Sequence, residues 1–224
     1  MLHYKASEIV QRAMTLANIQ NSSFVSATEN RQLINDAFWA LYQVMIDEGD
    51  VFFLKEIKHP SFVDGVYILP DDFYQLYAIR DNYGNGVLRK NKNTIKNGKC
   101  YDIRKRDIPT EVEDPETHET TTVLVAKPCV INYNNALIDE IEYYPQPKTL
   151  DIEGTGDVEL DIPSNAYYQC MLYYMAIWYK TRQNEDSTDI KALYEEALGN
   201  FTDTLKIDLN EYPQMRDVYT RIWR

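Results

Sequence analysis

The chain has 224 residues, of which 44% are hydrophobic and 26% charged, so it can bury a core without disulfides and is too apolar to be wholly disordered. Its net charge of -12 excludes a protein that grips nucleic acid over its whole surface, because phosphate binding needs clustered Lys and Arg. Eighteen Tyr against seven Phe leave two interpretations open, half-buried protein interfaces or a compositional habit of the source.

Two amphipathic helices are predicted in the first 50 residues. Over residues 5–20, the apolar positions Ile9, Val10, Ala13, Leu16 and Ala17 have helical spacing. A second helix follows Ser26, which has Glu29 at capping-box spacing, and ends at Gly49. Its apolar stripe consists of Leu33, Ile34, Ala37, Phe38, Leu41 and Met45.

From residue 51 to about residue 162 the sequence changes to short apolar or alternating runs broken by Gly, Pro and Asn. Examples are "VFFLKEI", "YQLYAIR", "TTVLVAKPCVINY" and "DEIEYYP". This texture predicts a strand-rich segment. Within it, "YGNGV" predicts a hairpin turn, because Asn85 and Gly86 tolerate positive φ.

Two further helices are predicted after the strands. Ser164 can cap the first, which carries Tyr167, Cys170, Met171, Tyr174, Met175 and Trp178. Asp186, Ser187 and Thr188 offer caps for the second. The stripe of the second helix is Ile190, Leu193, Tyr194, Ala197, Leu198, Phe201 and Leu205.

The order of these elements predicts an α+β fold, without the βαβ alternation of a parallel sheet. Each outer helix has one apolar face, so we expect the two terminal pairs to pack into a four-helix bundle. The predicted organisation is residues 1–50 and 164–208 as the two halves of the bundle and 51–163 as a β-rich insertion. An extended C-terminal tail, residues 209–224, is too apolar for an idle terminus.

Charge is uneven along the insertion. The basic stretch that lies between Leu88 and Asp107 is opposed only by Asp102, and it predicts a solvated hairpin or loop, or a contact with DNA or an acidic partner. The candidates for that contact are Arg89, Lys90, Lys92, Arg104, Lys105 and Arg106. The acidic stretch 151–161 is interpreted as a solvated turn, because it lacks the residue order of a calcium loop.

The adjacent acids Asp71 and Asp72 are interpreted as residues of a turn. Neighbouring side chains on a strand or helix point in different directions, so they rarely converge on one substrate. Pro70 fixes its own φ and favours a turn beside them. No phosphate loop, zinc-protease motif or nucleophile turn is present in the sequence. We therefore expect neither catalysis nor a metal or cofactor.

The three cysteines, Cys100, Cys129 and Cys170, form no C-x-x-C pair, so we expect reduced thiols. The N-terminus lacks the pattern of a signal peptide, and no run reaches about 18 apolar residues. The sequence predicts a product of the cytoplasm that has no membrane anchor.

The N-terminal half resembles the head-to-tail adaptor proteins, also called head-completion or neck-ring proteins, of short-tailed bacteriophages. The resemblance lies in "ASEIVQRAMTLANIQNSSFVSATENRQLINDAFWALYQVMID", then "FFLKE", then "YILPDDFYQLYAIRD". The C-terminal half matches in pattern only, through "NAYYQCMLYYMAIWYKTR" and "IKALYEEALGNFTDTLKID". The basic segment and the acidic stretch after Asp107 depart from the compact members of the family.

The resemblance implies a structural virion protein without enzymatic activity. It implies a homo-oligomeric ring, with about twelve copies, that attaches to the portal protein, extends the DNA channel and meets the next tail or ring protein. An acidic lumen would let DNA pass without binding it. Since the C-terminal segment of the family commonly reaches into the portal, the implied docking residues are Tyr212, Met215, Arg216, Tyr219, Arg221, Ile222, Trp223 and Arg224.

Two alternatives belong to other classes of protein. A β-rich module on a helical stalk would bind a soluble ligand as a free monomer. A polymer hydrolase would need two acids from Asp71, Asp72, Asp151, Glu153 or Asp157 to converge in a cleft.

Overall fold

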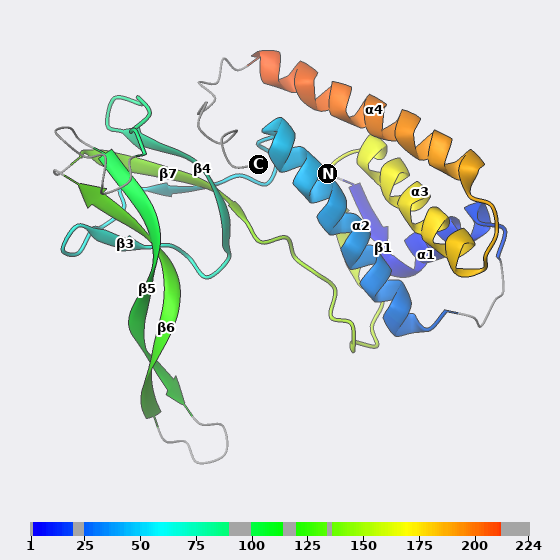
Figure 1. Cartoon of the computed structure of the whole chain (residues 1–224), viewed down its shortest axis with the longest axis horizontal. Coiled ribbons are helices and arrows are strands. Elements are labelled where there is room, and N and C mark those ends of the chain that lie inside the picture. The colour runs from blue at the N-terminus through cyan, green and yellow to red at the C-terminus, as the bar shows by residue number, and fades with distance from the viewer. Residues whose placement is uncertain (1, 20–24, 90–99, 114–119, 134–135, 212–224) are drawn as a thin grey trace. The chain divides into compact units, whose positions relative to one another are not determined.

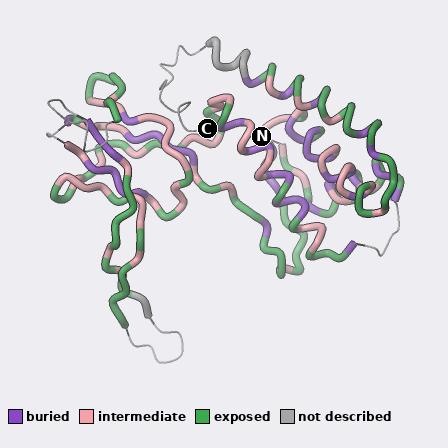
Figure 2. The backbone as a smooth tube through the Cα atoms, viewed as in Figure 1, coloured by how far each residue is buried: buried purple, intermediate pink, exposed green. Residues whose placement is uncertain are grey.

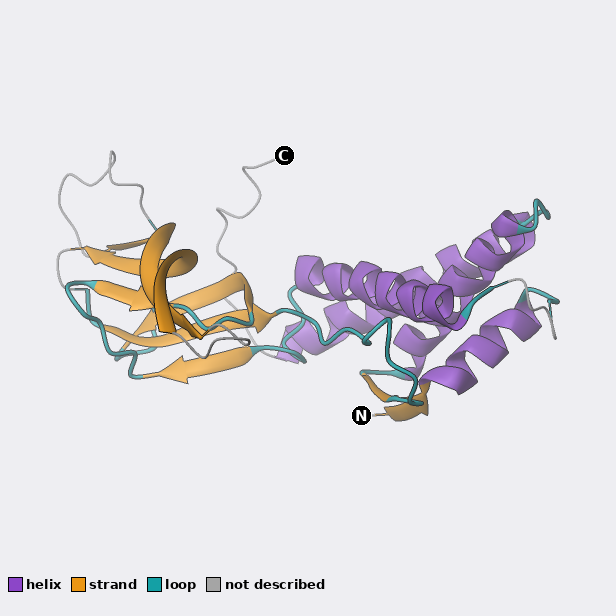
Figure 3. Cartoon of the chain, turned by 90° about the horizontal axis from the view of Figure 1, so that it is seen from below, coloured by secondary structure: helices purple, strands orange, loops and turns teal. Residues whose placement is uncertain are grey.

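The computed structural model describes residues 2–19, 25–89, 100–113, 120–133 and 136–211 (Figure 1). The chain forms two compact units, one from residues 1–52 and 147–214 and one from residues 53–146 and 215–224. We call them the helical unit and the β unit. Figure 3 shows that helices dominate the first and strands the second. The α+β class predicted from the sequence is confirmed.

The helical unit contains α1 (Ala6–Leu16), α2 (Ala27–Glu48), α3 (Asn165–Arg182) and α4 (Thr188–Glu211). The caps of α2 are those expected: Ser26 and Glu29 form a reciprocal capping box, and Gly49 ends the helix at φ 78°. The Ser164 side chain accepts a hydrogen bond from the Tyr167 amide at the start of α3. Local sequence therefore fixes where these helices begin and end.

Helix α3 lies at the centre of this unit and packs against α1, α2 and α4. Its Tyr167 is fully buried and donates a hydrogen bond of 3.0 Å to the carbonyl of Phe38 in α2. The Tyr167 ring meets Phe38 and Phe201 edge to face, which joins α2, α3 and α4 in one aromatic core. Two residues of the predicted stripes, Leu16 and Leu193, lie on the surface instead.

The helical unit also contains a small sheet that the sequence did not reveal. Strand β1 (Leu2–Lys5) pairs antiparallel with β8 (Glu159–Ile162). Residues 147–162 therefore group with the helices, although the sequence placed the end of the insertion at residue 163. The first helix is correspondingly shorter than the predicted 5–20, because residues 2–5 are extended and the chain turns at Asn18, whose φ is 60°.

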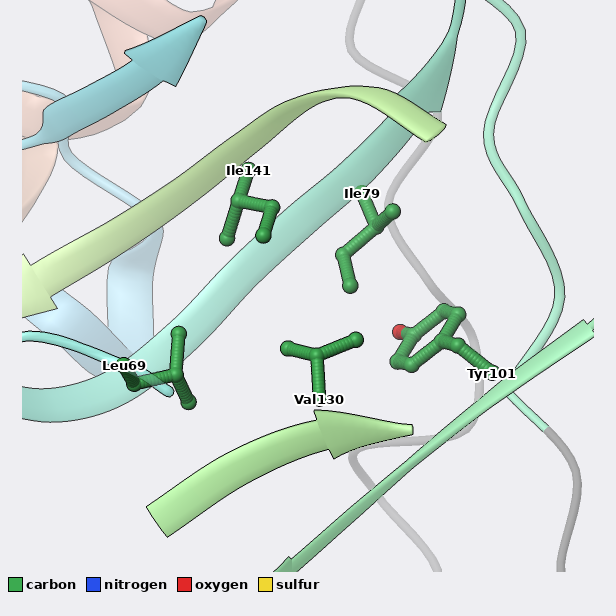
Figure 4. Close-up of a cluster of buried hydrophobic side chains, with 5 residues drawn as sticks. All are labelled: Leu69, Ile79, Tyr101, Val130 and Ile141. Atoms are coloured by element: carbon green, nitrogen blue, oxygen red, sulfur yellow. The ribbon is translucent and has the colours of Figure 1, made fainter. Parts of the chain in front are cut away.

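The β unit contains two antiparallel sheets. One has the order β2 (Lys55–Lys58), β7 (Ile138–Pro145), β4 (Phe73–Asp81), and the other β3 (Val66–Ile68), β6 (Thr120–Tyr133), β5 (Cys100–Glu113). Buried side chains from both sheets point toward one another in a compact cluster (Figure 4). The cluster consists of Leu69, Ile79, Tyr101, Val130 and Ile141.

Strands β5 and β6 pair over 14 residues each, from Cys100↔Tyr133 to Glu113↔Thr120. Strand β3 covers only the base of this ribbon, since it pairs with residues 129–131 of β6. Beyond the base the ribbon is two-stranded and largely exposed (Figure 2). We call residues 105–113 and 120–128 the ribbon arm.

Two tight turns shape the strands before the ribbon. Val63 and Val66 exchange backbone hydrogen bonds around Asp64 and Gly65, both at positive φ, as in a two-residue hairpin. In the predicted turn at Asn85 and Gly86, the positive φ falls on Gly84 instead. Asp81 causes this shift, because its carboxylate accepts hydrogen bonds from the amides of Tyr83 and Asn85.

Helix α4 continues to Glu211, so the boundary that the sequence placed after residue 208 falls inside a helix. No helix in the described part of the chain has the length and apolarity needed to cross a bilayer. Cys100, Cys129 and Cys170 are buried free thiols.

Candidate functional site

Two sets of candidate residues follow from the sequence, the implied portal-docking residues and the basic segment, and the structure describes part of the second set only. The implied portal-docking residues, Tyr212 to Arg224, lie outside the described residues, as do Lys90 and Lys92 of the basic segment. The structure describes Arg89, Arg104, Lys105 and Arg106. The candidate site that can be built is therefore the base of the β5–β6 ribbon.

Asp102 contacts two of the basic residues at the base of the β5–β6 ribbon. Its side chain is almost fully buried, and its carboxylate lies 2.8 Å from Arg104 Nε and 3.8 Å from Arg89 Nε. The hydrogen bond that Arg104 Nε donates to the Asp102 carboxylate raises the pKa of Arg104. Because a buried carboxylate needs a cationic partner, Arg89 and Arg104 are held as structural counter-ions. Both are thereby less available to a phosphate.

Lys105 and Arg106 remain exposed on β5, without a carboxylate partner among the described residues. Residues opposite each other in an antiparallel pair share a face of the ribbon, so Arg106 lies with Lys127 and Lys105 lies with Pro128 on the other face. Burial raises the pKa of the Cys129 thiol beside Arg106, so this thiol stays protonated at neutral pH. The expected basic patch is reduced to a few cations divided between two faces.

The side chains of the adjacent acids Asp71 and Asp72 point to different partners. The Phe73 amide donates a hydrogen bond to the Pro70 carbonyl, which closes a turn that contains Asp71 and Asp72. Asp71 contacts Lys127 at 3.0 Å, whereas Asp72 contacts Lys55 at 2.5 Å and accepts a hydrogen bond from the Tyr143 hydroxyl. The two carboxylates thus hold different strands in place, and they do not converge on a common site.

These contacts also shift two ionisation equilibria. The hydrogen bond from Lys55 is the main cause that lowers the pKa of Asp72. Burial first, and the hydrogen bond to Asp72 second, raise the pKa of Tyr143 to about 12. Asp72 is therefore an anion and Tyr143 a neutral donor at neutral pH, as a fixed structural pair requires.

Three other carboxylates approach one another on the β2–β7–β4 sheet. Oxygens of Glu56, Glu140 and Glu142 lie within 4.8 Å of one another. Arg80 reaches the same place, 3.0 Å from Glu142 and 3.9 Å from Glu140. The guanidinium supplies the positive charge that such a cluster needs, so these residues form a network of ion pairs.

The acidic stretch 151–161 is anchored to the N-terminal helices. Asp157 accepts hydrogen bonds from the amide and hydroxyl of Ser7, and Arg31 donates to the carbonyls of Asp151 and Gly156. A groove of about 490 Å³ lies here between α1, the start of α2 and residues 155–157. Its charged lining residues, Arg31 and Asp157, already hold the loop, so the groove serves the packing of the helical unit.

The ribbon arm is the surface that sequence reasoning missed. The basic segment between residues 88 and 107 was interpreted as a solvated hairpin or loop, or as a contact with DNA or an acidic partner, and the structure places its residues 100–107 in the long strand β5. The β-branched residues of "TTTVLVAKPCVINY", the strand that pairs with it, were the available signal for a long ribbon.

No family model matches this sequence, and no curated protein is significantly similar to it. The functional assignment consequently depends on the chemistry and geometry of the chain itself.

Proposed function

We propose that the chain is a head-to-tail adaptor of a short-tailed bacteriophage, a structural virion protein of the neck that forms a ring under the portal. In this proposal the ring has about twelve copies, extends the DNA channel and joins the portal to the next tail or ring protein. The four helices are the bundle at its centre, the β unit is the insertion, and the C-terminal segment is the docking tail.

The pattern from residue 6 to residue 81 carries this proposal. Two helices, the second with a capping box, precede the Leu-Pro-Asp-Asp-Phe-Tyr sequence, residues 69–74, that leads into β4. In the structure, three polar residues of that pattern have local structural roles: Ser26 caps a helix, and Asp71 and Asp72 tie a turn to Lys127 and Lys55. Such residues define a scaffold, which suits a protein that assembles.

The hydrolase alternative gains no support from the acids that it requires. Asp71 and Asp72 bind different lysines, and Asp157 binds Ser7. The alternative of a monomeric binding module gains none from the groove, whose ionic residues are engaged within the unit. We therefore propose a protein that catalyses no reaction and takes no cofactor.

The acidic charge supports the proposed channel role. The helical unit holds 8 Lys and Arg against 19 Asp and Glu, so a ring of such units repels DNA from its walls. A wall that bound phosphate would slow the passage of the genome. The basic residues Arg89 and Arg104 alter this little, because the Asp102 carboxylate lies beside both and offsets one of their two charges.

Mass photometry of the full-length chain mixed with the portal ring of the same phage tests the proposal. The comparison variant ends at Glu211, where α4 ends, so that the helix remains whole. We expect the portal to gain the mass of about twelve copies of the full-length chain and none of the truncated chain. A full-length matched control replaces Tyr219, Ile222 and Trp223 by Ser.

If the truncated chain binds the portal as well as the full-length chain does, the docking role of the tail is wrong. If neither binds, the adaptor proposal is wrong, and the monomeric binding module becomes the better hypothesis.

A further inference from the structure

The ribbon arm extends beyond β3, the strand that pairs with the base of the ribbon. Residues 105–113 and 120–128 extend for about 30 Å as a two-stranded ribbon, while β3 covers only residues 129–131 of β6. Isolated two-stranded ribbons are marginally stable in water, and they become stable when a face packs against another surface. The arm therefore has a structural need for a partner.

One face of the arm is suited to such packing. The register places Ile108 opposite Val125 and Thr110 opposite Val123, with Arg106 next along β5. We call these five residues the strip. Val123 is 46% exposed, and Ile108, Thr110 and Val125 are half-buried. Among the described residues of the arm, the charged side chains on this face are Arg106 and Lys127, and Lys127 is paired with Asp71 at 3.0 Å.

The other face differs in charge. It carries Asp107, Pro109, Glu111, Leu124 and Ala126, so carboxylates interrupt its apolar residues. An apolar centre beside cations is a poor phosphate site, because DNA affinity comes from clustered Lys and Arg. It is a good match for a protein surface that combines an exposed apolar side chain with acids.

This chain has such a surface on α4. Leu193 is 45% exposed although it belongs to the predicted apolar stripe, and Asp189 and Glu196 lie one helical turn from it on either side. Glu196 has no ion-pair partner among the described residues, whereas Asp189 lies 3.6 Å from Lys180. The whole helical unit has a formal charge of -11, which would attract a cationic strip.

We propose that the strip docks on the exposed face of α4 in a second copy of this chain. Val123 and Ile108 pack against Leu193, and Arg106 pairs with Glu196. Because the arm of one copy meets the helix of the next, this interface is heterologous and closes into a ring when the rotation permits. The inference deepens the proposed function, since it names the lateral contact on which the proposed ring rests.

Sedimentation velocity of the full-length chain across micromolar concentrations tests the interface. Val123→Asp introduces a charge that α4 repels and removes an apolar contact, so we expect self-association to weaken by at least about tenfold. Leu124→Asp is the matched control: it has the same charge change on the adjacent, more exposed residue of the opposite face. We expect this control to associate like the wild type.

A charge exchange tests the partner residue. Arg106→Glu alone should weaken self-association by about tenfold, and Arg106→Glu combined with Glu196→Arg should restore it to within about threefold of wild type. None of these residues belongs to either buried core, so we expect every variant to fold like the wild type. Far-UV circular dichroism and thermal unfolding of each variant check this.

The outcomes separate this inference from the adaptor proposal. A monomeric wild type, or a Val123→Asp variant that associates normally, overturns the docking of the strip even when the chain binds the portal. Failure of the exchange to restore association overturns the choice of α4. A wild type that self-associates through the strip but ignores the portal overturns the adaptor proposal and leaves the interface intact. Binding of the strip to DNA instead of to a second copy overturns the inference.

Discussion

The helical unit and the β unit differ in net charge and in the kind of core that they bury. Residues 1–52 and 147–214 have a formal charge of -11, whereas residues 53–146 hold 12 Lys and Arg against 15 Asp and Glu, a formal charge of -3. The acidic unit buries its aromatic stripes around α3, and the nearly neutral unit builds a small cluster between two sheets. Repulsion among surface acids is tolerated where the core is large.

The two units also differ in the apolar residues that they expose to solvent. In the helical unit, Leu16 and Leu193 are isolated exceptions on helices that are otherwise packed. In the β unit, a whole ribbon exposes residues such as Val123 and Leu124, the latter at 66%. The exposed apolar residues of the helical unit are scattered over helices and loops, whereas those of the β unit include two neighbours, Val123 and Leu124, on one ribbon.

The largest expected effect is in the core of the helical unit. Phe201→Ala removes a ring that is 1% exposed and meets Tyr167 edge to face, so we expect a loss of about 3 to 5 kcal/mol of unfolding free energy. Urea unfolding followed by tryptophan fluorescence measures it, because Trp39 and Trp178 lie in this unit. Leu193→Ala is the control, and the assignment fails if the two variants lose equal stability.

A somewhat smaller effect is expected in the core of the β unit. Ile141→Ala leaves a cavity among Leu69, Ile79 and Val130, and we expect a loss of about 2 to 4 kcal/mol. Hydrogen exchange with mass spectrometry should show faster exchange in peptides of residues 53–146, and it is the method of choice because these residues contain no tryptophan. Val63→Ala, at a residue 71% exposed, should leave exchange unchanged. Equal acceleration in the helices would mean that the two units unfold together.

Backbone conformation gives the next prediction. Gly65 has φ 73°, and a Cβ there would lie 3.2 Å from the Asn132 carbonyl oxygen. Gly65→Ala should therefore destabilise the β unit by about 1 to 2 kcal/mol. The matched substitution Gly86→Ala has no atom within 4 Å and no positive φ, so it should be nearly neutral. Thermal unfolding by circular dichroism compares them, and the reverse order would contradict the described turn.

The smallest effect concerns Asp72. Its pKa is lowered from the usual 3.8, so its contribution to stability is present above pH 3.8 and is lost as the pH falls through the folded-state pKa. Asp72→Asn should cost less than about 1 kcal/mol at neutral pH, since the side chain is 38% exposed, and this deficit should disappear in acid. Asp71→Asn is the control, at 85% exposure. A deficit that grows below pH 3.8 would contradict this linkage.

Tyr143 extends the same comparison to high pH. Its pKa is raised to about 12, so the stabilisation that it provides is present below about pH 10 and is lost as the pH rises toward 12. Tyr143→Phe should remove that alkaline dependence from the unfolding free energy of the β unit. An unchanged alkaline profile would show that other tyrosines cause the loss.

Sequence alone determined the local features of this protein. The Ser26 capping box, the Ser164 cap and the Gly49 terminus follow from side chains that bond to backbone within a few residues. The turn at Asp71 and Asp72 followed from Pro70 and from the divergence of adjacent side chains. The Asp64-Gly65 hairpin was not predicted, although Asp-Gly between apolar runs favours positive φ at both residues.

Tertiary structure alone decided the pairings between distant segments. Strand β1 is four residues long, and only its contact with β8, more than 150 positions away, makes it a strand. The buried Asp102 beside Arg89 and Arg104 turned an apparent basic patch into internal ion pairs. The ribbon became an arm because β3 ends early. Such outcomes depend on which surfaces meet, and a linear pattern does not contain that information.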